Sequence, residues 1–406
     1  MLSINGITDM LVTNGGLFKV TNSSLTYYEN QRFTGYGGLL NHIGGNVWHK
    51  KRLALDPAFN KIYLRSLVPK MNEIIYTVVQ DLKDCAVNSP VDVSWNMKKL
   101  AIQLIATIGY GTNLNTLPNI SLDNLLQYIS DMFDGFFGAA FDPMFMYKPS
   151  NRLSINRTKE AGVLLRQLGH DALAKRRLDL SMDYQTPSDL LAHSIEIQNN
   201  NAWYTDEEIV DDFVTFIVAG HETTSNALCF ILALLARHPE VYNKAVDEVN
   251  SVLDGQKSFI EAEDSHKLTY IECIIKESLR LYPVVSMVRR STHTDTLIGD
   301  YIIPKDTQVM TFPFIQGRTE KYWKNSTAFQ PERFLDKSVK NFTFIPFLTG
   351  PRKCIGINFA MLELKLVLAQ IILSFYLKAP DYQNIRAGFK MTLFPTEGTL
   401  IYLVEK

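Results

Sequence analysis

Segment 347–356 carries the strongest chemical signal in the chain: it reads Phe-Leu-Thr-Gly-Pro-Arg-Lys-Cys-Ile-Gly and precedes an apolar helical pattern over residues 358–376. Cys354 therefore stands just before a predicted helix, whose N-terminal partial charge lowers the pKa of a nearby thiol. Gly350 and Gly356 let the backbone turn so that amide groups can point at the sulfur. A thiolate held in this way is an iron ligand, whereas Cys354 taken alone would be read as a small core hydrophobe.

A second chemical signal is the stretch from Ala219 to Thr224, in the middle of a long apolar segment. Ala219, Gly220 and Thr223 share one face of the predicted helix and are small, so a flat ligand could lie against them. A glycine inside a helix costs about 1 kcal/mol relative to alanine, and a threonine bonded to the carbonyl four residues earlier bends a helix. Together they could open a groove for water and dioxygen. A glycine-assisted packing contact with a satisfied threonine is the plainer alternative.

A third signal is the pair Glu277 and Arg280, which share a face of a predicted helix that Pro283 ends. Such pairs usually lie on the surface and contribute less than about 1 kcal/mol. Here the pair is embedded in an apolar run, and a further arginine follows at Arg333. If the group is buried, removing one member should cost about 3–5 kcal/mol. Its role would then be folding and cofactor retention.

The chain resembles the cytochrome P450 family, because segment 347–356 matches that family's haem-binding pattern, FxxGxRxCxG. The resemblance implies that haem b is the cofactor and that Cys354 is the axial thiolate ligand of its iron. It also implies a haem-propionate contact for Arg352 and a family triad formed by Glu277, Arg280 and Arg333. The remaining candidate haem contacts near these motifs are Phe347, Ala219 and Gly220.

Other residues inherit roles from the same resemblance. Glu222 and Thr223 would be the acid and the alcohol that relay protons during oxygen activation, whereas His221 is expected to be structural. Trp48 and Arg52 resemble the family's WxxxR element, in which both residues bind a haem propionate. Arg290, seven residues after Pro283, would also meet a propionate. For each arginine alone, a solvated surface charge is the alternative.

The elements that must position these residues are mainly helices with small β-sheets, and we expect a single catalytic domain over residues 1–406 with the cytochrome P450 fold. Apolar periodicity predicts helices over 67–82 and 95–110. A capping box formed by Thr205 and Glu208 begins a long helix that runs from Asp206 to Arg237. Hairpins are expected around Gly299-Asp300 and over 395–398, and the polar segment 181–201 is expected to be a surface connection.

The amino-acid composition argues against several classes of protein. The chain has 406 residues, 41 Lys plus Arg and 42 Asp plus Glu, so bulk charge does not favour nucleic-acid binding. Four cysteines without a CxxC pair argue against a disulfide framework and structural zinc. The start of the chain shows no signal peptide, and the apolar stretch 213–236 is interrupted by polar residues, so we expect no transmembrane helix.

The resemblance implies a monooxygenase that uses dioxygen and electrons from NADPH-cytochrome P450 reductase. Segments 48–50, 211–223 and 279–283 look most like those of cholesterol 24-hydroxylase, which implies a sterol-like substrate. A fatty-acid or xenobiotic monooxygenase is the alternative within enzymes, and a catalytically inactive haem-binding remnant is the alternative of another class. Lys50, Lys51 and Lys353 could form a basic patch that docks an acidic electron donor, and a solvated helix face is the alternative.

The front of the chain departs from the family pattern. Animal members carry a membrane anchor, a proline-rich hinge and an early helix and sheet before the element that contains Trp48, but only 47 residues precede Trp48 here. We therefore expect the N-terminal part to be missing. The full-length form is expected at the cytosolic face of the endoplasmic reticulum membrane. Candidate channel-lining residues are Phe213, Phe216 and Ala219, together with segments 284–288 and 132–146.

Overall fold

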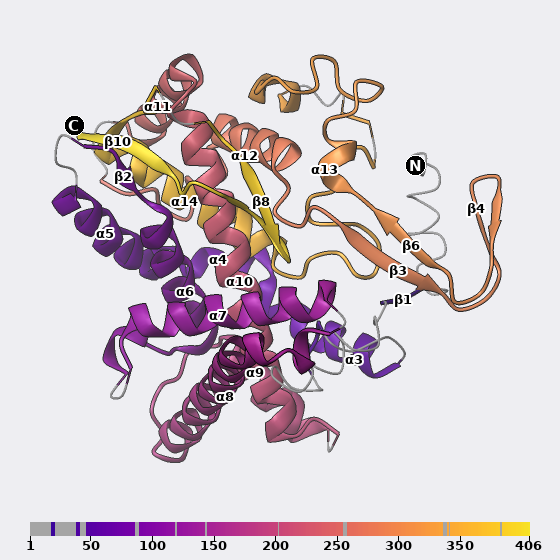
Figure 1. The fold of residues 1–406 in the computed structure, drawn as a ribbon. Helices are drawn as coiled ribbons and strands as arrows, with labels where there is room; N and C mark the ends of the chain where they lie inside the picture. The colour runs from indigo at the N-terminus through magenta and orange to yellow at the C-terminus, as the bar shows by residue number, and fades with distance from the viewer. Residues whose placement is uncertain are drawn as a thin grey trace. The chain divides into compact units, whose positions relative to one another are not determined.

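The computed structural model describes residues 18–20, 38–40, 46–85, 89–117, 120–142, 144–201, 203–254, 258–335, 339–340, 342–381 and 384–406 (Figure 1). Contacts divide the chain into two compact units, and each is described by itself. Unit 1 comprises residues 1–19, 61–100 and 223–406, and unit 2 comprises residues 20–60 and 101–222. Whether the whole chain is one domain stays a prediction.

Unit 1 is built around helix α14, Ile357–Ser374, which packs against α4, α5, α11 and α12. Helix α5 confirms the prediction for 67–82, and α14 confirms the helix predicted after Cys354. Glu248 of α11 accepts hydrogen bonds from the backbone N–H groups of Thr269, Tyr270 and Ile271, so α11 caps the first turn of α12. The other helical bounds are α4 Lys61–Ser66, α5 Val68–Cys85, α11 Pro239–Leu253, α12 Thr269–Leu281, α13 Pro313–Gln316 and the 3-10 turn η7 Pro331–Phe334.

The strands form four small sheets, ordered β1-β3-β6, β2-β10-β7, β4-β5 and β8-β9, and every pairing with a described register is antiparallel. The hairpin predicted at Gly299-Asp300 is confirmed, with Gly299 at φ 58° between β4 and β5. The bounds are β1 Phe18–Val20, β2 Val91–Asp92, β3 Val288–Thr292, β4 Thr296–Ile298, β5 Tyr301–Ile303, β6 Gln308–Thr311, β7 Phe375–Lys378, β8 Ala387–Lys390, β9 Thr392–Pro395 and β10 Leu400–Glu405.

The hairpin predicted over 395–398 is wrong. Strands do flank this turn, but β9 pairs with β8 through a turn at Met391, and β10 pairs with β2 and β7. The reason lies at Asp92 of β2, whose carboxylate accepts a hydrogen bond from the Thr399 N–H at 2.8 Å. A Cβ at Gly398 would lie 2.4 Å from that same carboxylate. This contact aligns β10 with β2 instead of β9.

Unit 2 is helical, with α7 packed along α8 and α3 against α9. The surface connection predicted for 181–201 is wrong in its second half, because α9 forms there and buries Leu191 and Ile195. Asp189 starts this helix by accepting a hydrogen bond from the Ala192 N–H, and it pairs with buried Arg176. The bounds are α3 Asn46–Leu55, η3 Asp56–Phe59, η4 Leu114–Thr116, α7 Leu122–Phe141, η5 Phe145–Tyr147, η6 Pro149–Asn151, α8 Arg152–Ser181 and α9 Leu190–Asn200.

Helices α6, Ser94–Tyr110, and α10, Asp206–Leu235, have residues in both units and confirm the two predicted helices. The Thr205 hydroxyl accepts a hydrogen bond from the Glu208 N–H at 3.3 Å, as predicted for the start of α10. By length and composition α10 and α14 could each cross a membrane, but 72% and 56% of their apolar windows are buried, and buried core helices pass the same test. The prediction of a mainly helical fold with small sheets is confirmed.

Candidate functional site

Cys354 lies on an exposed loop that leads into α14. Its N–H donates a hydrogen bond to the Phe347 carbonyl at 2.9 Å, and the Lys353 N–H donates to the Gly350 carbonyl at 3.1 Å. Gly350 has φ 78°, the left-handed conformation that favours glycine. Gly356 has φ −82°, so its own backbone does not require glycine. The loop therefore presents the thiol three residues before the first residue of the helix.

Arg290 is a partly buried arginine of unit 1 that could receive an anion. It lies in β3, where it pairs in register with Val309, and its Nη1 donates to the Arg289 carbonyl at 2.9 Å. Burial lowers the pKa of its guanidinium, and no ion pair to a carboxylate is found for it among the described residues. A partly buried cation in this state is stabilised by an acidic ligand group. Phe347 and Arg352, the other predicted contacts in unit 1, are half-buried on the Cys354 loop.

Trp48 and Arg52 lie in α3 of unit 2, four residues apart, as the predicted element requires. Both are largely buried, with 7% and 8% of their surfaces exposed. Arg52 donates through Nε to Asp56 at 3.0 Å, so one edge of its guanidinium is fixed within unit 2. A guanidinium has five N–H donors, the type of group that the predicted propionate contact needs.

The middle of α10 contains a short accessible stretch between two buried runs. Residues 213–217 and 224–235 are buried, whereas Ala219 is exposed and Gly220, Glu222 and Thr223 are half-buried. A Cβ on Gly220 would lie 3.0 Å from Cγ1 of Ile105, so packing against α6 accounts for this glycine. His221 is 2% exposed, and its Nε2 lies 4.0 Å from the Glu222 carboxylate, in agreement with a structural role. Roles for the other four residues stay predictions.

Glu277, Arg280 and Arg333 form the predicted buried group. Arg280 donates to both carboxylate oxygens of Glu277 at 2.7 Å, and Arg333 donates to the same carboxylate at 3.2 Å. The side chains of Glu277 and Arg280 are 0% exposed. Arg280 uses its remaining donors on the carbonyls of Gly317, Ser326 and Ala328. Every N–H of this guanidinium is therefore satisfied, and the group joins α12 to segments 317–333.

The prediction that Lys51 belongs to a basic docking patch is wrong. Its side chain is 0% exposed and pairs with Glu208 and Asp212, so it cannot meet a partner protein. Lys50 and Lys353 are exposed, as that prediction requires. The sequence hid this burial because the two acids lie 157 and 161 residues farther along the chain.

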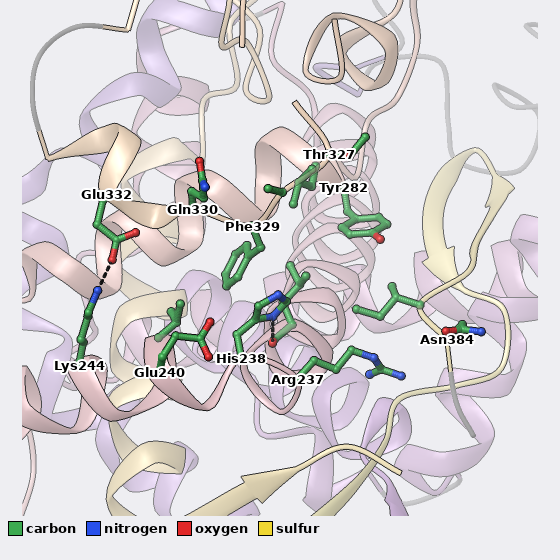
Figure 2. Close-up of a pocket in the computed structure, with 15 residues that line it drawn as sticks. Arg237, His238, Glu240, Lys244, Tyr282, Thr327, Phe329, Gln330, Glu332 and Asn384 are labelled. Atoms are coloured by element: carbon green, nitrogen blue, oxygen red, sulfur yellow. Dashed lines mark hydrogen bonds and ion pairs between the residues drawn. The ribbon is translucent and has the colours of Figure 1, made fainter. Parts of the chain in front are cut away.

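A separate cavity of about 660 Å³ lies in unit 1 where α10 and α12 end and α11 begins (Figure 2). His238 donates through Nδ1 to the Leu234 carbonyl at 2.8 Å, and Lys244 pairs with Glu332 on the cavity lining at 2.7 Å. None of the predicted haem residues lines this cavity. Within the described residues, no cluster of three His, Cys, Asp or Glu side chains could hold a metal ion.

Comparison with known proteins places these features in a family. The family model described as "Cytochrome P450" matches residues 2–401. The chain belongs to the cytochrome P450 family. It is 29% identical to cytochrome P450 3A13 of Mus musculus, over 86% of this chain and 72% of that protein. It is 25% identical to probable cytochrome P450 4aa1 of Drosophila melanogaster and 27% identical to cytochrome P450 4V2 of Rattus norvegicus, each over 96% of this chain and 77% of the relative.

Membership of the cytochrome P450 family establishes the general reaction and the cofactor. Cytochromes P450 are haem-thiolate monooxygenases in which a cysteine binds the iron, and they take dioxygen, a lipophilic substrate and electrons from a redox partner. These relatives are named as cytochromes P450 of the 3A and 4 groups, and their names do not support the closer resemblance to cholesterol 24-hydroxylase. The residues fit haem: a thiol on a turned loop, and an arginine in a partly buried position suited to an acidic group.

Proposed function

We propose that this cytochrome P450 binds haem through Cys354 and hydroxylates a lipophilic small molecule. The observation that carries the assignment is the position of Cys354, on a glycine-turned loop directly before α14. Cys85 and Cys354 are the exposed cysteines, whereas Cys229 and Cys273 are buried, and only Cys354 stands in the family motif. Its partners in haem binding would be Arg352, Arg290, Trp48 and Arg52 at the propionates, and Phe347, Ala219 and Gly220 at the ring.

When bound, haem supplies the iron at which dioxygen is reduced and one oxygen atom is passed to the substrate. The chain's own contribution would lie on α10. Thr223 would hold a proton donor in place through its hydroxyl, and Glu222 would resupply the proton from solvent. Both side chains lie in the accessible stretch between two buried runs of α10, which supports this assignment.

For the substrate we favour a fatty acid or a foreign compound. The wider family takes lipophilic substrates, and the relatives do not favour the narrower sterol reading. A sterol is the second candidate and rests on the motif resemblance of segments 48–50, 211–223 and 279–283. Phe213 and Phe216, proposed from sequence as channel residues, are buried against Tyr110 and Phe59, at ring distances of 4.6 and 5.5 Å.

The electron donor we propose is NADPH-cytochrome P450 reductase, and the location we propose is the endoplasmic reticulum membrane, at its cytosolic face. Exposed Lys50 and Lys353 would contribute to docking an acidic partner. Both proposals rest on the sequence resemblance. Replacing each lysine by glutamate should slow electron transfer from the reductase, more at low salt than at high salt.

The test of the proposed function compares two cysteine variants of the expressed chain. Cys354→Ala should abolish the thiolate-type absorption of the reduced carbon monoxide adduct, and Cys85→Ala, at the other exposed cysteine, should leave it unchanged. Loss in neither variant, or in both, would overturn the assignment. Wild type is then supplied with reductase, NADPH and, separately, a fatty acid, a foreign compound or cholesterol. Bound haem without any oxygenated product would identify an inactive remnant, and product from cholesterol alone would favour the sterol.

A further inference from the structure

Lys51 is the most completely buried lysine of unit 2. Its side chain is 0% exposed, and fully buried lysines occur almost only when they are paired. The ammonium contacts the Glu208 carboxylate and lies 3.0 Å from Oδ2 of Asp212. It also lies 5.0 Å from the centre of the Tyr204 ring, at cation–π distance. Two acids of α10 and Tyr204, two residues before that helix, therefore surround one charge on α3.

Asp212 is the centre of this arrangement and is itself 1% exposed. Its Oδ2 accepts a hydrogen bond from the Tyr204 hydroxyl at 2.5 Å, and its Oδ1 accepts one from the Leu39 N–H at 2.8 Å. The Tyr110 hydroxyl donates to its backbone carbonyl at 3.3 Å. Segment 38–40, α3 and Tyr204 thus meet the carboxyl group of this α10 residue, and α6 bonds to its backbone carbonyl. Such a fully bonded group fixes the position of each element that contributes to it.

The helix that Lys51 anchors is the one that carries two proposed haem contacts. Lys51 lies three residues after Trp48 and one residue before Arg52, so the same turn of α3 carries all three. Arg52 is further tied by Asp56 within unit 2. A rotation or shift of α3 would therefore move both side chains together, and the Lys51 ion pairs oppose such a movement.

We propose that Lys51 is a positioning residue for haem binding. Its ion pairs with Glu208 and Asp212 fix α3 against α10 and thereby fix the orientation of the Trp48 and Arg52 side chains. The inference rests on the proposed function, in which those two residues bind the haem propionates. Lys51 itself touches neither haem nor substrate in this proposal. It acts through the turn of helix on which Trp48 and Arg52 stand.

The test measures the rate at which the loaded protein releases haem to excess apomyoglobin. Lys51→Met alone leaves Asp212 buried without its cation, so the principal variant is Lys51→Met with Asp212→Asn, which strands no fully buried charge. The matched control is Arg176→Met with Asp189→Asn, which removes another buried ion pair of unit 2 at 5% and 1% exposure. Circular dichroism at the assay temperature establishes that each variant is folded.

We expect the Lys51/Asp212 variant to release haem about tenfold faster than wild type, in the middle of the range for residues that share a network. The control should release it at the wild-type rate. Arg52→Ala should accelerate haem release from the wild-type protein. In the Lys51/Asp212 variant the same substitution should add little, because the Arg52 side chain has already lost its orientation. If Lys51 had only a structural role, the two changes would act independently and their fold-increases in the haem-release rate would multiply.

Three results overturn the proposal: wild-type release by the folded Lys51/Asp212 variant, equal acceleration in the control, or full additivity with Arg52→Ala. The proposed function fails in a different way, because wild type would then lack thiolate-bound haem altogether. If haem binds but Arg52→Ala does not change its release, the premise is removed and the proposal for Lys51 falls with it.

Discussion

Thr223 is the side chain at which proton delivery is most directly tested. In Thr223→Ala the helix backbone stays, but the hydroxyl that would hold the proton donor is gone, so electrons should appear as peroxide. Product formed per NADPH should fall by at least about tenfold, a small part of the roughly 10²–10⁴-fold effect of a positioned proton donor. Simultaneous assays of NADPH, peroxide and product measure the ratio.

The matched control is Thr77→Ala, on α5, whose hydroxyl donates to the carbonyl four residues earlier, Glu73, at 3.1 Å. It should keep the wild-type ratio of product to NADPH. An unchanged ratio in Thr223→Ala would remove the proton-relay assignment and leave the threonine with a structural role in α10.

Glu363 of α14 is a buried acid, 1% exposed, whose Oε1 has no hydrogen-bond partner among the described residues. Burial raises the pKa of this carboxyl well above its ordinary value, and a hydrogen bond from Thr224 offsets only part of the shift. A raised folded-state pKa means that the stabilisation is full below the ordinary value and is lost as pH rises through the folded pKa.

Glu363→Gln keeps the size of the side chain and removes the ionisation. The free energy of unfolding of wild type should therefore fall relative to that of the variant as pH rises above about 5, by at most about 1.4 kcal/mol per pH unit for one proton. Urea unfolding of both proteins between about pH 5 and about pH 8 gives this difference. Parallel pH profiles would show that the carboxyl is not buried as described.

At the scale of elements, α12 is joined to segments 317–333 by one carboxylate. Glu277→Ala leaves Arg280 fully buried without its acid, and we expect a loss of about 3–5 kcal/mol in the free energy of unfolding. Lys276→Ala is the control on the same helix, because its pair with Glu272 is partly exposed, at 33% and 35%. It should cost at most about 1 kcal/mol. Equal losses in urea unfolding would contradict the special role of the buried triad.

The elements that sequence predicts well are those whose signal is local. Helices α5, α6 and α10 follow from apolar periodicity, and the β4–β5 turn follows from Gly299. Helix α9 was missed because its asparagines look like a loop, although Asp189 caps it. The pairing of β10 with β2 depends on residues about 300 positions apart, here Leu400 and Asp92, and no local pattern encodes such a partner.

The candidate site also contains residues that the sequence predicts and residues that it does not. The Cys354 loop, Trp48 and Arg52 are found from short motifs, because their spacing is set within one turn or one helix. The burial of Lys51 and the neutral environment of Glu363 are not, because both depend on side chains from other helices. Motifs thus identify the candidate groups for cofactor binding, but tertiary packing decides which neighbours support them.

For the molecule as a whole, haem should contribute directly to stability. A ligand that binds only the folded state stabilises it by about 2.7 kcal/mol when its free concentration is 100 times the dissociation constant. Haem-free protein should therefore melt at a lower temperature than the loaded protein, and added haem should raise the melting temperature of wild type but not that of Cys354→Ala. Identical melting curves with and without haem would contradict binding to the native state.

The Glu248 cap also bears on how unit 1 opens. The N–H groups of Thr269, Tyr270 and Ile271 are bonded to an acid on α11, so the first turn of α12 cannot fray independently of that neighbour. In deuterium exchange these three amides should open together with α11 and not ahead of it. The two helices would then unfold as a single cooperative block, with the boundary of that block set by one glutamate.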